Sequence, residues 1–287
     1  MTISDDLENA LHRAFVAVRG AGLKVAGLVG AILLSSCATV PDLPGLDIRQ
    51  ALAPTGKLRV ALILGAPANA IRDPASGEMK GVGYDLGIEF AKRLGVPFEP
   101  VLYPAVGALF DDAKRKAWDV TFNGVTSERE KYLDYTSPHL EIEFGYLVRV
   151  GSSLSTAADV DRPGVRIVVP EKGALDSLLS RKLKNATMIR AAGLPGALQV
   201  FKSGGADAFG ANKANLFQMM DQVPGSRVLD GGPGTETQAL LIPKAGHAGL
   251  AYARTFIEDA KARGLVKAAI DRAGLRGAHV ADRHEGP

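Results

Sequence analysis

The stretch Val165-Arg-Ile-Val-Val-Pro-Glu-Lys-Gly-Ala-Leu-Asp-Ser-Leu-Leu-Ser-Arg-Lys-Leu183 indicates how this chain folds. Its first five residues are mostly β-branched and predict a strand. Gly173 predicts a turn after that strand. Leucines then recur at the spacing of one helix face, at positions 175, 178, 179 and 183. A strand, a turn and an amphipathic helix in this order are the repeating unit of an α/β fold.

The same alternation continues through the chain from Lys57 onward. Before residue 150, the pattern predicts strands at 58–63, 118–122 and 145–150, and helices over 85–95, capped by Asp85, and 106–113. After residue 150, it predicts strands at 165–169, 187–189, 206–209 and 239–242, and helices over 174–183, 197–202, 213–221 and 248–263. Asn212 is expected to cap the helix over 213–221. We therefore expect an α/β fold with two lobes, each a mainly parallel sheet flanked by helices.

The composition is that of an ordinary globular protein. The chain has 287 residues, 46% hydrophobic and 23% charged, which excludes long disorder, collagen and coiled coil. Its 34 basic and 31 acidic residues give a net charge of +3, too balanced to indicate a nucleic-acid partner. The single cysteine, Cys37, excludes a disulfide framework and a Cys-based zinc site.

The first residues have the features of a secretory signal. The ten-residue apolar run Val25–Leu34 is half as long as the roughly 20 residues that a membrane-spanning helix needs. The string Leu34-Ser35-Ser36-Cys37 resembles the bacterial lipoprotein box, in which the cysteine is acylated and becomes the new N-terminus. We therefore expect a signal peptide over 1–36, then the lipidated Cys37 and a tether over 37–54. The alternative is a free cysteine beside a plain cleavage site.

Three longer stretches together resemble the bacterial extracellular solute-binding proteins, family 3, which serve polar amino acid importers. They are 77–96, with Gly83-Tyr84-Asp85, then 118–139, with Thr126-Ser-Glu-Arg129, and 197–208. The resemblance covers roughly residues 55 to 275. It implies a two-lobed, type II periplasmic binding protein clamshell on the periplasmic side of the cell envelope.

In that family the chain crosses between the lobes twice. The crossings are expected near 147–151 and near 237–240. Lobe 1 is then 55–147 plus 239–287, and lobe 2 is 148–238.

The turn at Thr126 predicts an anion site without reference to any family. Thr126 or Ser127 can cap a following helix, whose free backbone N–H groups favour a negative charge. Arg129, in the first turn, carries a planar fork suited to a carboxylate. The alternative is that Ser127-Glu-Arg-Glu130 is a capping box of the kind that many helices carry without a ligand.

The resemblance implies that the ligand carboxylate binds Arg129. The expected ligand set is Asn123, Gly124, Thr126, Arg129, Gly173, Asn212, Asn69 and Glu171.

The sequence departs from the family pattern at several of these positions. Gly124 stands where a Ser or Thr is common, and Ala174 where a Thr is common. Asn212 stands where amino-acid binders carry the aspartate that pairs with the ligand's ammonium. Small residues near Ala66 and Val106 replace the usual aromatic pair. The ligand is therefore either a carboxylate without an ammonium, or another acid supplies the charge, with Glu171, Asp207 and Glu236 as candidates.

The resemblance implies a binding protein that delivers a small carboxylate-bearing solute to an ABC permease in the inner membrane. We expect no cofactor and no metal, since the five histidines have no ligand spacing. The first alternative is a periplasmic dehydratase of the cyclohexadienyl dehydratase type, which would place its acid at or near Asn212. The second is a sensor input domain, although no effector region is attached.

Overall fold

The computed structural model describes residues 43–244 and 247–282, so the predicted signal segment and Cys37 lie outside the described residues. The elements of the first half, in chain order, are α2 (Leu46–Leu52), β1 (Leu58–Ile63), β2 (Ile71–Arg72), β3 (Met79–Lys80), α3 (Val82–Leu94), β4 (Phe98–Tyr103), α4 (Val106–Ala113), β5 (Val120–Gly124), the 3-10 turn η2 (Arg129–Lys131) and β6 (Leu133–Arg149).

The elements of the second half are the 3-10 turn η3 (Ala157–Asp159), β7 (Arg166–Pro170), α5 (Ala174–Lys182), β8 (Thr187–Ala191), α6 (Gly193–Lys202), β9 (Ala208–Asn212), α7 (Lys213–Met220), β10 (Ser226–Val228), β11 (Thr235–Pro243), α8 (His247–Ala262), α9 (Leu265–Ala273) and β12 (Ala278–Val280). Each strand and helix expected from the sequence overlaps an observed one. The strand expected over 145–150 is the last part of the longer β6, and the ends of the others differ by a few residues. The predicted α/β fold is confirmed.

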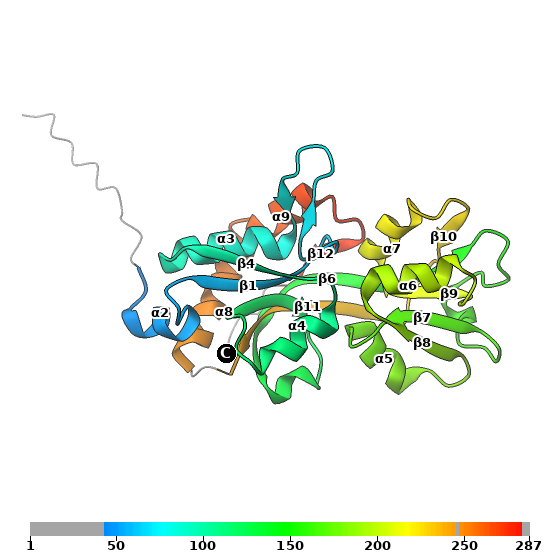
Figure 1. The fold of residues 1–287 in the computed structure, drawn as a ribbon, viewed down its shortest axis with the longest axis horizontal. Helices are drawn as coiled ribbons and strands as arrows, with labels where there is room; N and C mark the ends of the chain where they lie inside the picture. The colour runs from blue at the N-terminus through cyan, green and yellow to red at the C-terminus, as the bar shows by residue number, and fades with distance from the viewer. Residues whose placement is uncertain (1–42, 245–246, 283–287) are drawn as a thin grey trace, which may run out of the picture. The chain divides into compact units, whose positions relative to one another are not determined.

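Two sets of three parallel strands form the framework. β1 pairs in parallel with β4 and β5, and β7 pairs in parallel with β8 and β9. Two antiparallel strands, β6 and β11, join the sets into one path in the order β4-β1-β5-β11-β6-β9-β7-β8. Figure 1 shows β6 and β11 running between the strands β1 (blue) and β4 (teal) and the green strands β7 and β8. Each parallel set thus comes from a strand-helix alternation, as the sequence pattern predicts.

Strand β6 changes partners within its length. From Leu133 to Glu143 it pairs with β11, and from Phe144 to Val148 it pairs with β9. Strand β11 pairs with β5 from Gln238 to Leu241. The crossings expected near 147–151 and 237–240 lie close to these changes of partner, and the lobe boundaries themselves remain a prediction.

Helices α8 and α9 pack against the N-terminal set of strands. Phe256 and Ile257 of α8 are fully buried in one cluster with Phe90 of α3 and Phe122 of β5. The rings of Phe90 and Phe256 lie 4.5 Å apart between centroids. Helix α8 therefore shares one hydrophobic core with α3 and β5.

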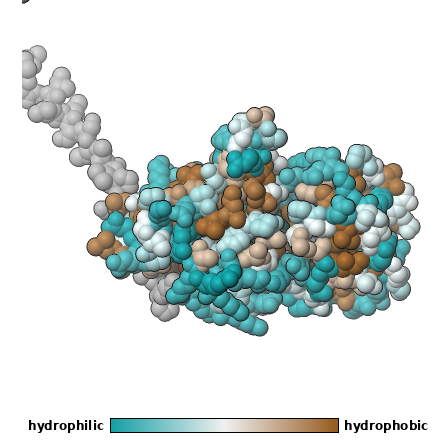
Figure 2. Space-filling view, viewed as in Figure 1, coloured by the Kyte–Doolittle hydropathy of each residue, from teal (hydrophilic) through white to brown (hydrophobic). Residues whose placement is uncertain are grey.

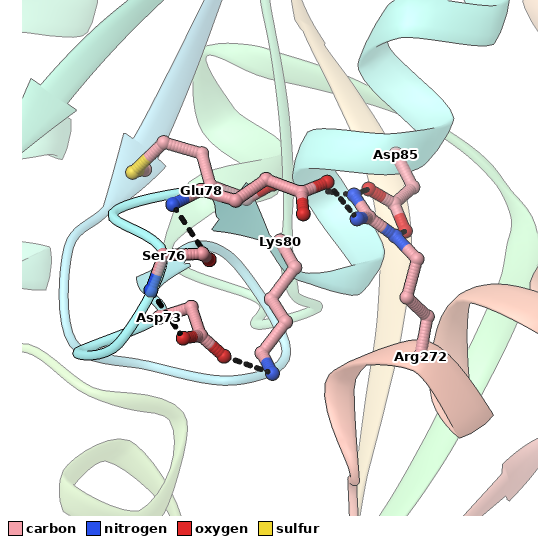
Figure 3. A network of polar contacts seen from close by, with 7 residues as sticks. Asp73, Ser76, Glu78, Lys80, Asp85 and Arg272 are labelled. Carbon is pink, nitrogen blue, oxygen red and sulfur yellow. Dashed lines mark hydrogen bonds and ion pairs between the residues drawn. The ribbon is translucent and has the colours of Figure 1, made fainter.

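Asp85 does not cap α3, contrary to expectation. The helix begins at Val82 with Gly81 as N-cap residue, so Asp85 lies one turn inside it. Its carboxylate accepts from Arg272 of α9, Nε to Oδ2 2.8 Å, and Arg272 also binds Glu78 at 2.8 Å (Figure 3). The Asp85 carboxylate thus forms a tertiary ion pair with Arg272 and does not cap the helix. The predicted end of the helix is confirmed, since Gly95 adopts φ 69°, a left-handed conformation that glycine favours.

The predicted tether is too long. Its last part forms α2, in which Leu52 is fully buried, and Ile48 packs against the same core. Leucine and isoleucine at these positions remove apolar surface from water, which a free spacer would not do. Any tether therefore ends before Leu46.

The described residues contain no candidate membrane-spanning helix. Within 43–244 and 247–282, no helix combines the length and the apolar content that crossing a bilayer requires. On the face in Figure 2, hydrophilic residues predominate and hydrophobic residues gather in separate patches. Scattered exposed apolar side chains such as Leu64 and Val150 are normal for a protein surface.

His139 is buried without a hydrogen bond. Neither ring nitrogen has a partner among the described residues, and the ring meets Phe122 edge-on at 5.5 Å. Burial, with a smaller effect of the nearby Lys261, lowers the pKa of His139 to about 3. The native state therefore holds this imidazole neutral, while the unfolded chain binds a proton below about pH 6.5.

This burial predicts acid sensitivity. Between about pH 6.5 and pH 3 the unfolded state binds the extra proton, so the free energy of unfolding falls as the pH is lowered, by about 1 kcal/mol per pH unit. The variant His139→Leu removes this contribution and should show a shallower decline. Urea unfolding of both proteins from pH 7 to pH 4 tests this. Parallel declines would contradict it.

Candidate functional site

A cavity of about 310 Å³ lies at the carboxyl ends of both sets of parallel strands. Its walls come from the segments that follow β1, β4 and β5 on one side and β7, β8 and β9 on the other. Open parallel sheets place ligand sites at this edge. The volume is at the lower end of the range of small-molecule sites, about 300–1,000 Å³. Ala66 and Val106 line the cavity, so the aromatic pair that the resemblance would place there is absent from these positions.

Arg129 lines the cavity and is buried, with 4% of its surface exposed. One terminal nitrogen donates to the Gly124 carbonyl oxygen, and the other donates to the Lys172 carbonyl oxygen at 2.8 Å. The guanidinium carbon lies 3.8 Å from the centre of the Phe110 ring. A guanidinium has five N–H groups, and these two bonds use two of them. The remaining donors suit a carboxylate ligand.

Burial also acts on the protonation of this residue. It lowers the pKa of Arg129 to about 10, and nearby Glu236 acts in the opposite direction. A group with this pKa still carries its charge at neutral pH. The cavity therefore holds a permanent cation.

Lys172 connects the two walls of the cavity beside Arg129. Its backbone has φ 58°, a left-handed conformation that is uncommon for a residue with a side chain. Its N–H donates to Asp176 Oδ2 at 2.9 Å, and its ammonium pairs with Asp111 of α4 at 2.7 Å. These contacts fix the carbonyl that accepts from Arg129. Strain of this kind is found where a loop serves a binding site.

No α-helix follows Thr126, which corrects the expected anion site. The segment makes only the 3-10 turn η2, Arg129–Lys131, before the chain enters β6 at Leu133. The Thr126 hydroxyl accepts from the Arg129 N–H at 3.3 Å, and no capping box forms at Ser127. The group that could bind an anion here is therefore the Arg129 side chain and not a helix terminus.

Asn69 and Asn123 form one polar part of the wall. Both are buried, and Asn123 Nδ2 lies 3.4 Å from Asn69 Oδ1 and 3.2 Å from the Thr121 hydroxyl. Asn69 Oδ1 also accepts from the Ile63 N–H at 3.3 Å. This network orients both amides next to the end of β5.

Asn212 and Glu236 form the opposite polar part. Asn212 caps α7 as predicted, since its Oδ1 accepts from the Asn215 N–H at 3.0 Å. Its Nδ2 donates to Glu236 Oε2 at 2.5 Å. Glu236 is partly buried as a residue, and burial raises the pKa of its carboxyl group, against smaller effects of Asn212, Gln238 and Arg129.

Four further amides line the cavity that the sequence did not single out, and three of them have an oxygen that is unpaired in the described part of the chain. Asn215, Gln218 and Gln238 each have a buried side-chain oxygen without a hydrogen-bond partner among the described residues. Such oxygens need a donor, which water or a ligand can supply. Two periodicities could have pointed to them: positions 212, 215 and 218 follow one helix face, and positions 236 and 238 share one strand face.

Of the predicted ligand set, Asn69, Asn123, Arg129, Gly173 and Asn212 line the cavity. Gly124 and Thr126 lie just behind this wall and support Arg129 through their oxygens. Glu171 does not line it, and its N–H donates to the Ala191 carbonyl oxygen. Asp207 is taken up by an ion pair with Arg166 at 2.9 Å. Of the three candidate acids, only Glu236 lines the cavity.

The side-chain types that bind metal ions are not clustered among the described residues. The described residues contain no group of three His, Cys, Asp or Glu side chains placed to hold a metal ion. Arg129 and Glu236 are the charged residues of the described lining. The cavity is therefore suited to binding through hydrogen bonds and two opposite charges.

Known proteins resemble the chain over most of its length. The ABC transporter glutamine-binding protein GlnH of Bacillus subtilis (strain 168) is 23% identical over 186 residues, which are 63% of this chain and 67% of GlnH. A mutant of ArgBP from T. maritima superposes with a TM-score of 0.69 at 23% identity, covering 80% of this chain and 99% of that one. An ancestral amino acid-binding protein, a precursor of cyclohexadienyl dehydratase, superposes with a TM-score of 0.64 at 20% identity, covering 76% and 96%.

The two structural likenesses support the fold, that of the type II periplasmic binding proteins. The family assignment rests on the sequence. A model of the bacterial extracellular solute-binding proteins, family 3, matches residues 58–273, about three quarters of the chain. The chain therefore belongs to the bacterial extracellular solute-binding proteins, family 3.

Proposed function

We propose that this protein captures a small carboxylate-bearing solute, an amino acid or a related organic acid, and delivers it to an ABC permease. The observation that carries the proposal is the buried guanidinium of Arg129, held on two carbonyl oxygens and an aromatic ring with donors to spare. A guanidinium forms paired hydrogen bonds with a carboxylate in a geometry that lysine cannot match. Capture for an importer agrees with the named relatives, which are transport binding proteins.

Two lobes close around the solute in this proposal. Lobe 1 is 55–147 plus 239–287, and lobe 2 is 148–238. The contacts from Lys172 to Arg129 and Asp111 would then connect the lobes in the closed state. Strands β6 and β11 would contain the hinges, since they alone join the two sets of parallel strands in the described part of the chain.

Binding without catalysis is the function we favour over a dehydratase. Protonation of a leaving hydroxyl needs an acid at or near position 212 in the dehydratase reading. Asn212 is an amide and carries no such proton, and the neighbouring Glu236 Oε2, 2.5 Å from Asn212 Nδ2, is already used as the acceptor of the Asn212 N–H. The sensor alternative uses the same cavity and differs only in the partner of the closed form.

We further propose that the protein is held at the periplasmic side of the cell envelope by a lipid on Cys37. The support is the string Leu34-Ser35-Ser36-Cys37 after an apolar run of ten residues. The first described helix, α2, begins at Leu46, which leaves a short linker between the lipid and the body.

Arg129 should be indispensable for binding. In Arg129→Ala the ligand carboxylate loses its partner in a desolvated site, which should weaken binding by about 30- to 5000-fold. Arg129→Lys should restore only part of it. Calorimetry with any amino acid or organic acid that raises the unfolding temperature in a screen provides the measurement.

The matched control is Glu130→Gln, which neutralises an exposed charge next to Arg129. It should bind as the parent does. Equal affinities for Arg129→Ala and the parent would show that the carboxylate binds elsewhere.

The lipid anchor predicts a change of location. Replacing Cys37 by Ala removes the thiol that would be acylated, so the body should move from the membrane fraction to the soluble periplasmic fraction. Ser36→Ala keeps a small residue before the cysteine and should stay with the membrane. Fractionation with immunodetection distinguishes the two variants. Membrane association of Cys37→Ala would mean that another anchor exists.

A further inference from the structure

We infer that Glu236 of β11 supplies the negative charge that pairs with the solute's ammonium, in place of an acid at position 212. The inference rests on the proposed function and assigns a specificity-determining residue of the same cavity. It assigns a role to an acid outside the position at which the family resemblance would place one.

The amide of Asn212 is oriented by two hydrogen bonds. Its oxygen is used by the N–H of Asn215 at the start of α7, so its nitrogen must point the other way. There it meets Glu236 Oε2 at 2.5 Å. An amide N–H₂ in this orientation needs an acceptor, and a carboxylate is the strongest that a protein offers. Asn212 thus holds Glu236 in place and does not itself receive a cation.

Gly124 leaves the space that the carboxyl group of Glu236 occupies. A Cβ added at position 124 would lie 2.8 Å from Glu236 Oε1 and 3.0 Å from the Cβ of Ala174. Any side chain there would displace the carboxylate or the start of α5. Gly124 and Asn212 are two departures from the family pattern, and both lie next to the same carboxyl group. One relocated acid accounts for both.

The charges of the described lining then match a zwitterion. Arg129 contributes one positive charge, and Glu236 contributes one negative charge once a bound ammonium favours its ionised form. An amino acid offers a carboxylate to the first and an ammonium to the second. An acid without the ammonium would leave Glu236 unpaired, and a buried unpaired charge is costly. The arrangement therefore selects against the deaminated acid.

The test compares paired ligands on three proteins. The probes are the twenty L-amino acids and, for each amino acid that binds, the same acid without its α-amino group. The proteins are the parent, Glu236→Gln and the exposed control Glu130→Gln, each checked for folding by thermal unfolding. In the parent and the control, the amino acid should bind at least about 30-fold more tightly than its deaminated partner. In Glu236→Gln this ratio should fall below about threefold, because only the amino acid loses affinity.

Two more variants separate a charge effect from damage to the cavity. Asn212→Asp combined with Glu236→Gln keeps a carboxylate and an amide side by side and exchanges their places, so it should recover at least about tenfold of the lost selectivity. Gly124→Ala should lower the amino-acid selectivity in the parent and have little further effect on the selectivity of Glu236→Gln.

The outcomes decide between the inference and the function on which it rests. An unchanged ratio in Glu236→Gln, tight binding of the deaminated acid by the parent, or binding of none of the twenty amino acids overturns the inference. If Arg129→Ala still loses the carboxylate ligands in the first two cases, the proposed function stands without it. If Arg129→Ala binds as the parent does, the proposed function fails as well.

Discussion

The buried guanidinium of Arg129 connects three parts of the chain that are distant in sequence. It stacks on Phe110 of α4, donates to Gly124 at the end of β5 and donates to Lys172 in the loop before α5. A cation out of water is stable only where its hydrogen bonds are made. Its hydrogen-bond partners are neutral carbonyl groups, so two of its N–H groups are bonded while its positive charge is not neutralised. This is the arrangement that keeps an attraction for an anion while fixing the side chain that exerts it.

Strand β11, which carries the acid Glu236 and the amide Gln238, is also one of the two strands that join the sets of parallel strands. Glu236 and Gln238 lie on β11, and Phe144 on β6 marks the change from one ladder to the other. In the proposed closure of two lobes, hydrogen bonds of a ligand to these residues would act directly on the strands that contain the hinges. Asn212, at the start of α7, binds Glu236 from the other wall of the cavity. The cavity thus lies where β6 and β11 join the two sets of parallel strands.

The sequence predicts the fold well because the signals are local. The strand and helix of residues 165–183 follow from β-branched residues, one glycine and the leucine spacing, and Asn212 caps α7 as its residue type suggests. Two predictions were wrong, namely that Asp85 caps a helix and that a helix follows Thr126. The Asp85 carboxylate instead pairs with Arg272, and β6 begins too soon after Thr126 to leave room for a helix. In the site, Arg129 was predicted from the family resemblance together with its place in the turn after Thr126, although the helix expected there does not form.

The sequence names Glu236 only as one of three candidate acids and cannot choose among them. Its proposed role depends on a carboxyl group of β11 that meets Asn212 from another strand and fills the space beside Gly124, which no pattern within one segment records.

The most direct measurement of the central claim is a crystal structure of the protein with a bound L-amino acid chosen by thermal shift. The account predicts the ligand carboxylate on the guanidinium of Arg129 and the ligand ammonium within hydrogen-bonding distance of the Glu236 carboxylate, with Asn212 still donating to that carboxylate. A ligand whose carboxylate lies away from Arg129, or whose ammonium is bound without Glu236, would contradict it.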